Sequence, residues 1–184
     1  MTADYTKVVT ESKDFADMKN EINNSPYYGS TFEHFWMASS KRKGVYGERF
    51  LDIISGNMNI PCYSGKEVKK QKLVQFDRLS DFDRVIEVDH VYYKVEVKTS
   101  TEWDNNGGFK FQQIRPYHDY DILVCHFVYP ETIKSFFAWK DSIDFSQMKG
   151  QHGGNAAKET KWFTVDSEDY LEDIFTPYSD IVSI

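Results

Sequence analysis

The spacing of hydrophobic positions predicts helices in the first third of the chain. Apolar residues recur at helical intervals over residues 44–56, so this segment is expected to be a helix with one buried face, and Gly56 is its expected stop. Shorter helices are expected at residues 14–22 and 31–39, separated from their neighbours by turns at 23–29 and 41–44.

Beyond residue 72 the pattern changes to short runs rich in β-branched and aromatic residues. Residues 82–88 and 91–99 flank the short polar link Asp89-His90, which predicts a β-hairpin. Residues 121–128 (DILVCHFV) are the most apolar run and predict a central strand buried on both faces. The remaining expected elements are strands near 73–76, at 135–139 and at 162–165, a short helix at 109–115 stopped by Pro116, a loop at 147–160 and a closing helix at 167–175.

This order of elements predicts an α/β fold with a mixed central β-sheet flanked by helices. The 184 residues suit a single domain. We divide it into an N-terminal helical extension (residues 1–40), a core (44–128) and a C-terminal part of strands, loop and helix (129–184).

Composition excludes several classes of protein. Hydrophobic residues make up 40% of the chain, enough for a buried core, yet no apolar run is long enough to span a bilayer. The polar N-terminus lacks a signal-peptide core, and Cys62 and Cys125 have no CxxC partner. We therefore expect a cytoplasmic protein with free thiols and no membrane partner.

The net charge of −7 argues against a protein that holds nucleic acid through a large basic field. A metal site built from carboxylates is compatible with that charge, because the bound cations offset it. Two basic strips, residues 41–43 and 66–72, could contact a polyanion or be ordinary solvated loops.

Candidate chemistry is concentrated in residues 80–100 (SDFDRVIEVDHVYYKVEVKTS). Side chains alternate along a strand, so Glu96 and Lys98 project from one face. In a hairpin that turns at residues 89–90, Asp83 lies beside the end of the strand that carries them. Two carboxylates and one lysine are therefore expected to converge at one end of a sheet.

These groups suit the hydrolysis of a phosphodiester. Mg²⁺ prefers carboxylate and water oxygens, and it lowers the pKa of a bound water while it neutralises phosphate. A neighbouring lysine can orient that water and stabilise developing negative charge. The backbone carbonyl of Val97 is a further candidate metal ligand.

Asp83 followed by Glu96-Val97-Lys98 at a strand end resembles the PD-(D/E)XK nuclease superfamily, which includes the type II restriction endonucleases. The resemblance covers about residues 44–128. It implies a restriction-endonuclease-like catalytic core that uses Mg²⁺, with Mn²⁺ as a substitute, and it assigns Asp83 and Glu96 as metal ligands and Lys98 as the residue that positions water.

The resemblance also widens the expected site. Glu48 matches a helix-borne acid that assists at the metal, and Gln113 or Gln112 matches a glutamine after the catalytic strand. Phe82 stands where the pattern has proline, which leaves Asp81 as an alternative to Asp83. His118 and His126 are expected to be structural or exposed, since no zinc-binding spacing is present.

Polar residues near the expected cleft are candidate DNA contacts, although an ordinary surface loop explains the last four equally well. They are Gln112, Arg115, Asn105, Asn106, Gln151, His152, Asn155 and Lys158.

The resemblance favours a sequence-specific endonuclease of the restriction type that cuts double-stranded DNA as a homodimer, since each chain would carry one active site. Two alternatives stay open. One is a structure-selective repair, recombination or phage nuclease, and the other is a non-catalytic DNA-binding module on the same fold.

Overall fold

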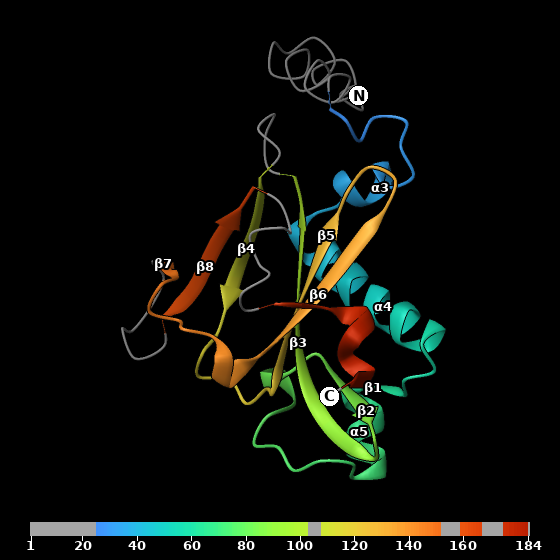
Figure 1. The fold of residues 1–184 in the computed structure, drawn as a ribbon, viewed down its shortest axis with the longest axis vertical. Coiled ribbons are helices and arrows are strands. Elements are labelled where there is room, and N and C mark those ends of the chain that lie inside the picture. The colour runs from blue at the N-terminus through green and yellow to red at the C-terminus, as the bar shows by residue number, and fades with distance from the viewer. Residues whose placement is uncertain (1–24, 103–107, 152–158, 167–174, 184) are drawn as a thin grey trace, which may run out of the picture.

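The computed structural model describes residues 25–102, 108–151, 159–166 and 175–183. It is a mixed α/β fold, as predicted: a six-stranded central sheet carries helix α4 on one face, and a three-stranded sheet lies beside its upper part (Figure 1). The central sheet has the order β1-β2-β3-β5-β6-β9, in which the β3–β5 pair is parallel and the other pairs are antiparallel. Its strands are β1 (Cys62–Ser64), β2 (Arg84–Val88), β3 (Val91–Thr101), β5 (Ile122–Val128), β6 (Ile133–Trp139) and β9 (Thr176–Pro177).

The predicted hairpin is confirmed. Asp89 and His90 have φ values of 50° and 65°, the left-handed conformation that tight two-residue hairpin turns require. Strand β2 begins at Arg84, opposite Val95, whereas β3 continues past Val95 to Thr101. The second half of β3 therefore has an edge that β2 does not cover.

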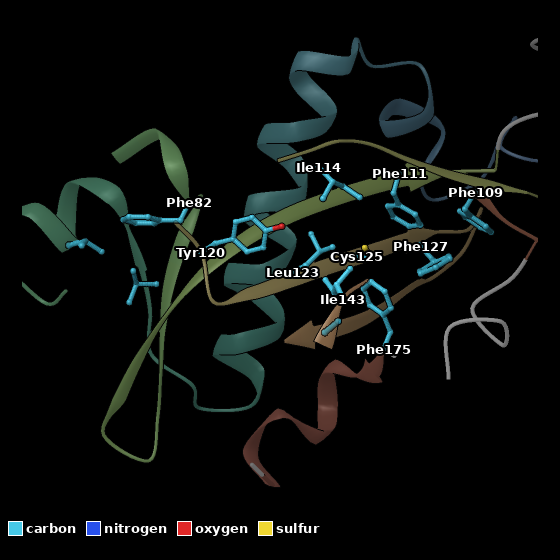
Figure 2. Packing of buried hydrophobic residues seen from close by; sticks show 13 residues of the cluster. Phe82, Phe109, Phe111, Ile114, Tyr120, Leu123, Cys125, Phe127, Ile143 and Phe175 are labelled. Carbon is cyan, nitrogen blue, oxygen red and sulfur yellow. The ribbon is translucent and has the colours of Figure 1, made fainter. Parts of the chain in front are cut away.

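The predicted central strand is also confirmed, since β5 is buried along its whole length between β3 and β6. One of its faces packs against α4 (Ser40–Asn57) through Leu51. The other face places Leu123, Cys125 and Phe127 in an aromatic cluster with Phe109 and other residues of the second sheet (Figure 2).

The prediction of a helix at residues 109–115 is wrong. This segment is strand β4 (Phe109–Ile114), which pairs with β8 (Thr160–Val165), and β8 pairs with β7 (Lys149–Gln151). Phe109 and Phe111 point inward in strand alternation, and a β-bulge then separates Phe111 from Ile114. The bulge gives the buried residues a spacing of three at that point, which imitates a helical pattern.

The expected turn at residues 41–44 and the expected strand at 73–76 are also wrong. Helix α4 already begins at Ser40, and residues 66–71 of the second basic strip lie in α5 (Gly65–Gln71). Leu73, Val74 and Phe76 pack against the core from a connecting segment without strand pairing, so burial rather than pairing explains their apolar character.

The remaining predicted elements differ in outcome. The 31–39 helix is reduced to α3 (Glu33–Trp36), and both strands at 135–139 and 162–165 are present within β6 and β8. Part of the expected 147–160 loop is strand β7. The helices expected at 14–22 and 167–175 lie outside the described residues, apart from Phe175. Short 3₁₀ helices cover Leu79–Asp81, Lys140–Ser142 and Tyr178–Ser183.

Gly47 allows α4 to lie directly against β3. A Cβ at Gly47 would meet Thr99 Oγ1 at 2.0 Å and Thr99 Cβ at 3.2 Å, whereas a Cβ at Gly56 of the same helix meets nothing within 4 Å. We expect Gly47→Ala to lower the free energy of unfolding by about 1–2 kcal/mol, because overpacking outweighs the gain in helix propensity. Gly56→Ala is expected to raise it by about 0.5 kcal/mol. Urea denaturation of both variants measures this, and equal signs would contradict the close approach.

Candidate active site

Asp83, Glu96 and Lys98 come together where β2 begins, against the middle of β3. Asp83 lies just before β2, where its N–H donates to the Val95 carbonyl at 2.8 Å and its Oδ2 accepts the Val97 N–H at 2.8 Å. Glu96 and Lys98 are two positions apart on β3, so they share one face of the strand, and Lys98 Nζ lies 2.5 Å from Glu96 Oε1. The predicted trio is therefore assembled within the described structure.

The Val97 carbonyl lies at the same edge. Within a strand, the N–H and C=O groups of one residue point to the same side, and this side alternates along the chain. The Val95 carbonyl and the Val97 N–H both bond to Asp83, so the Val97 carbonyl also points toward the side that β2 leaves uncovered. A main-chain oxygen and two carboxylates thus lie around one strand end.

The electrostatics of this cluster are those of a buried negative site. Glu96 is only 3% exposed. Burial raises the pKa of Glu96, and the nearby Asp83 carboxylate raises it further, whereas Lys98 and Arg115 oppose the shift. A bound cation would relieve both the burial of this charge and its repulsion from Asp83.

Glu48 lies close to the trio but is held by an ion-pair network that the sequence analysis missed. Arg84 Nη1 lies 2.6 Å from Glu48 Oε2 and 2.9 Å from the Asp83 carbonyl, and its Nε lies 2.7 Å from Asp52 Oδ1. Burial raises the pKa of Glu48, and the Arg84 hydrogen bond opposes that rise. The four-residue spacing of Glu48 and Asp52 on one helix was the available signal.

Asp81 and Asp83 occupy different environments. The Asp83 carboxylate contacts β3, whereas Asp81 Oδ1 lies 3.9 Å from His118 Nε2. Asp83 rather than Asp81 is therefore the carboxylate beside Glu96. His118 is mostly buried, and burial together with Arg115 lowers its pKa. Its position next to the site was not expected from the sequence.

His126 has a structural role and both cysteines are free thiols, as expected. His126 is fully buried in β5, its Nδ1 lies 2.7 Å from Ser135 Oγ, and burial lowers its pKa to about 4. Cys62 and Cys125 are free thiols.

A cleft of about 410 Å³ runs along the uncovered edge of β3, between the start of α4 and strand β4. Among the described residues that line it, three are lysines and none is acidic, although the chain as a whole carries a net charge of −7. Lys98 belongs to both the cleft and the trio. The lining residues are Ser40, Lys43, Gly44, Val97, Lys98, Thr99, Ser100, Thr101, Lys110, Gln112 and Gln113.

The two glutamines enter the cleft because of the β4 bulge. Gln113 has a φ of 56°, and both Gln112 and Gln113 have exposed side chains beside Lys98. Arg115 follows the bulge and acts electrostatically on Glu96. The structure thus brings Gln112 and Gln113 to the expected cleft, whereas Arg115 does not line it.

Of the other predicted DNA contacts, only Gln151 lies within the described residues. Gln151 is the last residue of the outer strand β7. Asn105, Asn106, His152, Asn155 and Lys158 lie outside the described residues.

The donor set fits Mg²⁺ better than zinc. In the described part of the chain, no three or more His, Cys, Asp or Glu side chains gather in the way that a protein-ligated zinc site requires. Mg²⁺ is commonly held by one or two carboxylates with water and substrate oxygens in the remaining positions. Asp83, Glu96 and the Val97 carbonyl supply that pattern.

Comparison with known proteins gives little further guidance. No family model and no curated protein matches the chain. Among solved structures, a bacterial homing endonuclease, I-Ssp6803I, is similar with 21% sequence identity and a TM-score of 0.46, over 70% of this chain and 76% of that chain. Within the described residues, no helix combines the length and apolar character needed to cross a membrane.

Proposed function

We propose that this chain is a metal-dependent endodeoxyribonuclease that hydrolyses phosphodiester bonds in double-stranded DNA, with an active site of the PD-(D/E)XK type. The observation that carries the proposal is the junction of two features at Lys98. Lys98 is paired with Glu96, and it also lines a cleft whose described lining contains three lysines and no acid. A polyanion with a hydrolysable phosphate matches both features.

Asp83, Glu96 and the Val97 carbonyl would hold Mg²⁺, and Mn²⁺ is expected to substitute. When bound, the metal ion neutralises the scissile phosphate and lowers the pKa of a water molecule.

The protein's own groups complete the chemistry. Lys98 donates hydrogen bonds to the attacking water and to the oxygen that gains negative charge. Glu48, anchored by Arg84, assists through a water. Gln112 and Gln113 orient the phosphate or Lys98 from the opposite wall of the cleft.

We further propose that cleavage is sequence-specific and of the restriction type. The described residues of each chain offer one such site, so cutting both strands of a duplex would require two chains related by a two-fold axis. Gln151 and the polar residues that follow it remain candidates for reading bases.

Digestion of defined DNA tests the proposal. Purified protein is expected to nick or linearise a plasmid with Mg²⁺ or Mn²⁺ and to leave it intact with EDTA, since the carboxylates alone lack a Lewis acid. Discrete fragments with uniform ends support sequence recognition, and preferential cutting at nicks, junctions or single strands identifies the structure-selective alternative. The nuclease proposal fails if the DNA stays intact with both metal ions, or if Glu96→Ala protein cuts equally well.

A further inference from the structure

The outer face of the second sheet carries a basic and aromatic surface that extends beyond the cleft. Lys110 of β4 and Lys149 of β7 place their ammonium groups 4.5 Å and 4.9 Å from the ring centroid of Trp162, which lies on β8 between them. The indole N–H bonds to the Gly150 carbonyl at 3.3 Å, which anchors the ring to β7. We call these three residues the Lys110–Trp162–Lys149 face.

Strand alternation sends these residues away from the core. Phe109 and Phe111, on either side of Lys110, point inward, and so does Phe163 next to Trp162. The acid Glu159 would contact a Cβ at Gly150, so it lies on the other side of β7 from the Lys149 side chain. It is also paired there with Lys161 at 2.6 Å. Glu159 therefore does not neutralise the two lysines.

The ring holds two like charges close together on a partly exposed surface. Cation–π attraction to a tryptophan is worth about 0.5–2 kcal/mol, and it offsets part of their mutual repulsion. An extended polyanion is the partner that such a face fits, since phosphates contacted by lysines supply sequence-independent affinity.

Lys110 connects this face to the cleft. It lines the cleft opposite Lys98 and also lies over Trp162, so one basic track leads from the uncovered edge of β3 across β4 to β7. Figure 1 shows β4, β8 and β7 arranged in that order beside the upper half of β3.

We propose that the nucleic acid held in the cleft extends over the Lys110–Trp162–Lys149 face, where the two lysines contact backbone phosphates outside the cleaved bond. This inference rests on the proposed function for the identity of the polyanion. It assigns to the second sheet the role of binding the flanking substrate and to Trp162 the role of positioning both ammonium groups.

Salt-dependent DNA binding tests it. The parent is the full chain with Glu96→Gln, bound to a labelled duplex with Ca²⁺ over a range of NaCl concentrations. Adding Lys110→Gln and Lys149→Gln is expected to raise Kd about tenfold and to reduce the slope of log K against log salt by about 1.8, because two phosphate contacts are lost. Trp162→Phe is expected to retain a reduced share of the affinity, since phenylalanine is the weaker cation–π partner.

The matched control is Lys69→Gln with Lys70→Gln on the exposed side of α5. It removes the same charge away from the cleft and should leave the slope of the parent unchanged. A slope for the Lys110/Lys149 variant equal to that of this control overturns the inference. If the unmutated chain binds DNA but does not cleave it, the proposed function fails. The salt dependence of binding still tests the Lys110–Trp162–Lys149 face in that case. Absence of DNA binding by the parent would defeat both.

Discussion

Glu96→Gln is expected to lower the rate of DNA cleavage by about 10³-fold or more, and Asp83→Asn is expected to do the same. Each change keeps the shape of the side chain but removes the charge that would hold the cation. Glu96 is buried and its pKa is already raised by burial, so the neutral glutamine carries a smaller desolvation cost than the carboxylate. Activity should therefore be lost while the unfolding temperature stays close to that of the unmutated protein. Single-turnover cleavage and thermal unfolding measure the two effects.

Asp81→Asn is the matched control, because it removes the same charge two residues before Asp83. Asp81 faces His118 rather than β3, so this variant is expected to retain activity within about tenfold of the unmutated protein. If Asp81→Asn is as inactive as Asp83→Asn, the assignment of the metal ligand is wrong.

Phe127→Ala is expected to lower the free energy of unfolding by about 3–5 kcal/mol. Phe127 is fully buried on β5 next to Phe109 and Phe111 (Figure 2). Its ring centroid lies 4.9 Å from those of Phe109 and Phe111 and 5.7 Å from that of Phe136. Truncation leaves a cavity between the central sheet and β4. The loss would be a large fraction of the total stability of about 5–15 kcal/mol of an ordinary domain. Urea denaturation measures it.

The same substitution should also weaken DNA binding, because β4 carries the far wall of the cleft. Tyr28→Ala is the control, since Tyr28 is 56% exposed and its loss is expected to cost less than about 0.5 kcal/mol. A cost below about 1 kcal/mol for Phe127→Ala would show that the two sheets do not depend on this contact.

The hairpin and the pairing of Glu96 with Lys98 could be predicted because they depend on local rules. Asp89 and His90 form a tight turn between two β-rich runs, and alternation alone places Glu96 and Lys98 on one face. The burial of β5 could likewise be predicted from its apolar sequence, since a strand covered on both faces needs no polar positions.

Strand β4 shows where local rules fail. Its bulge shifts the inward residues from a spacing of two to a spacing of three, and the segment then resembles a helix. Pairing with β8, a strand some fifty residues later in the chain, selects the strand conformation. The same bulge turns Gln112 and Gln113 into the cleft, so the position of two candidate site residues depends on a partner far along the chain.

By itself, the sequence determined the α/β class, the β2–β3 hairpin, the central strand and the pairing of Glu96 with Lys98, because turn preference and side-chain alternation act between near neighbours. Only the tertiary structure decided that Asp83 rather than Asp81 meets β3, because that follows from where β2 begins. It also decided the Arg84 network and the acid-free lining of the cleft, since these join helix, hairpin and second sheet across separations that no local pattern encodes.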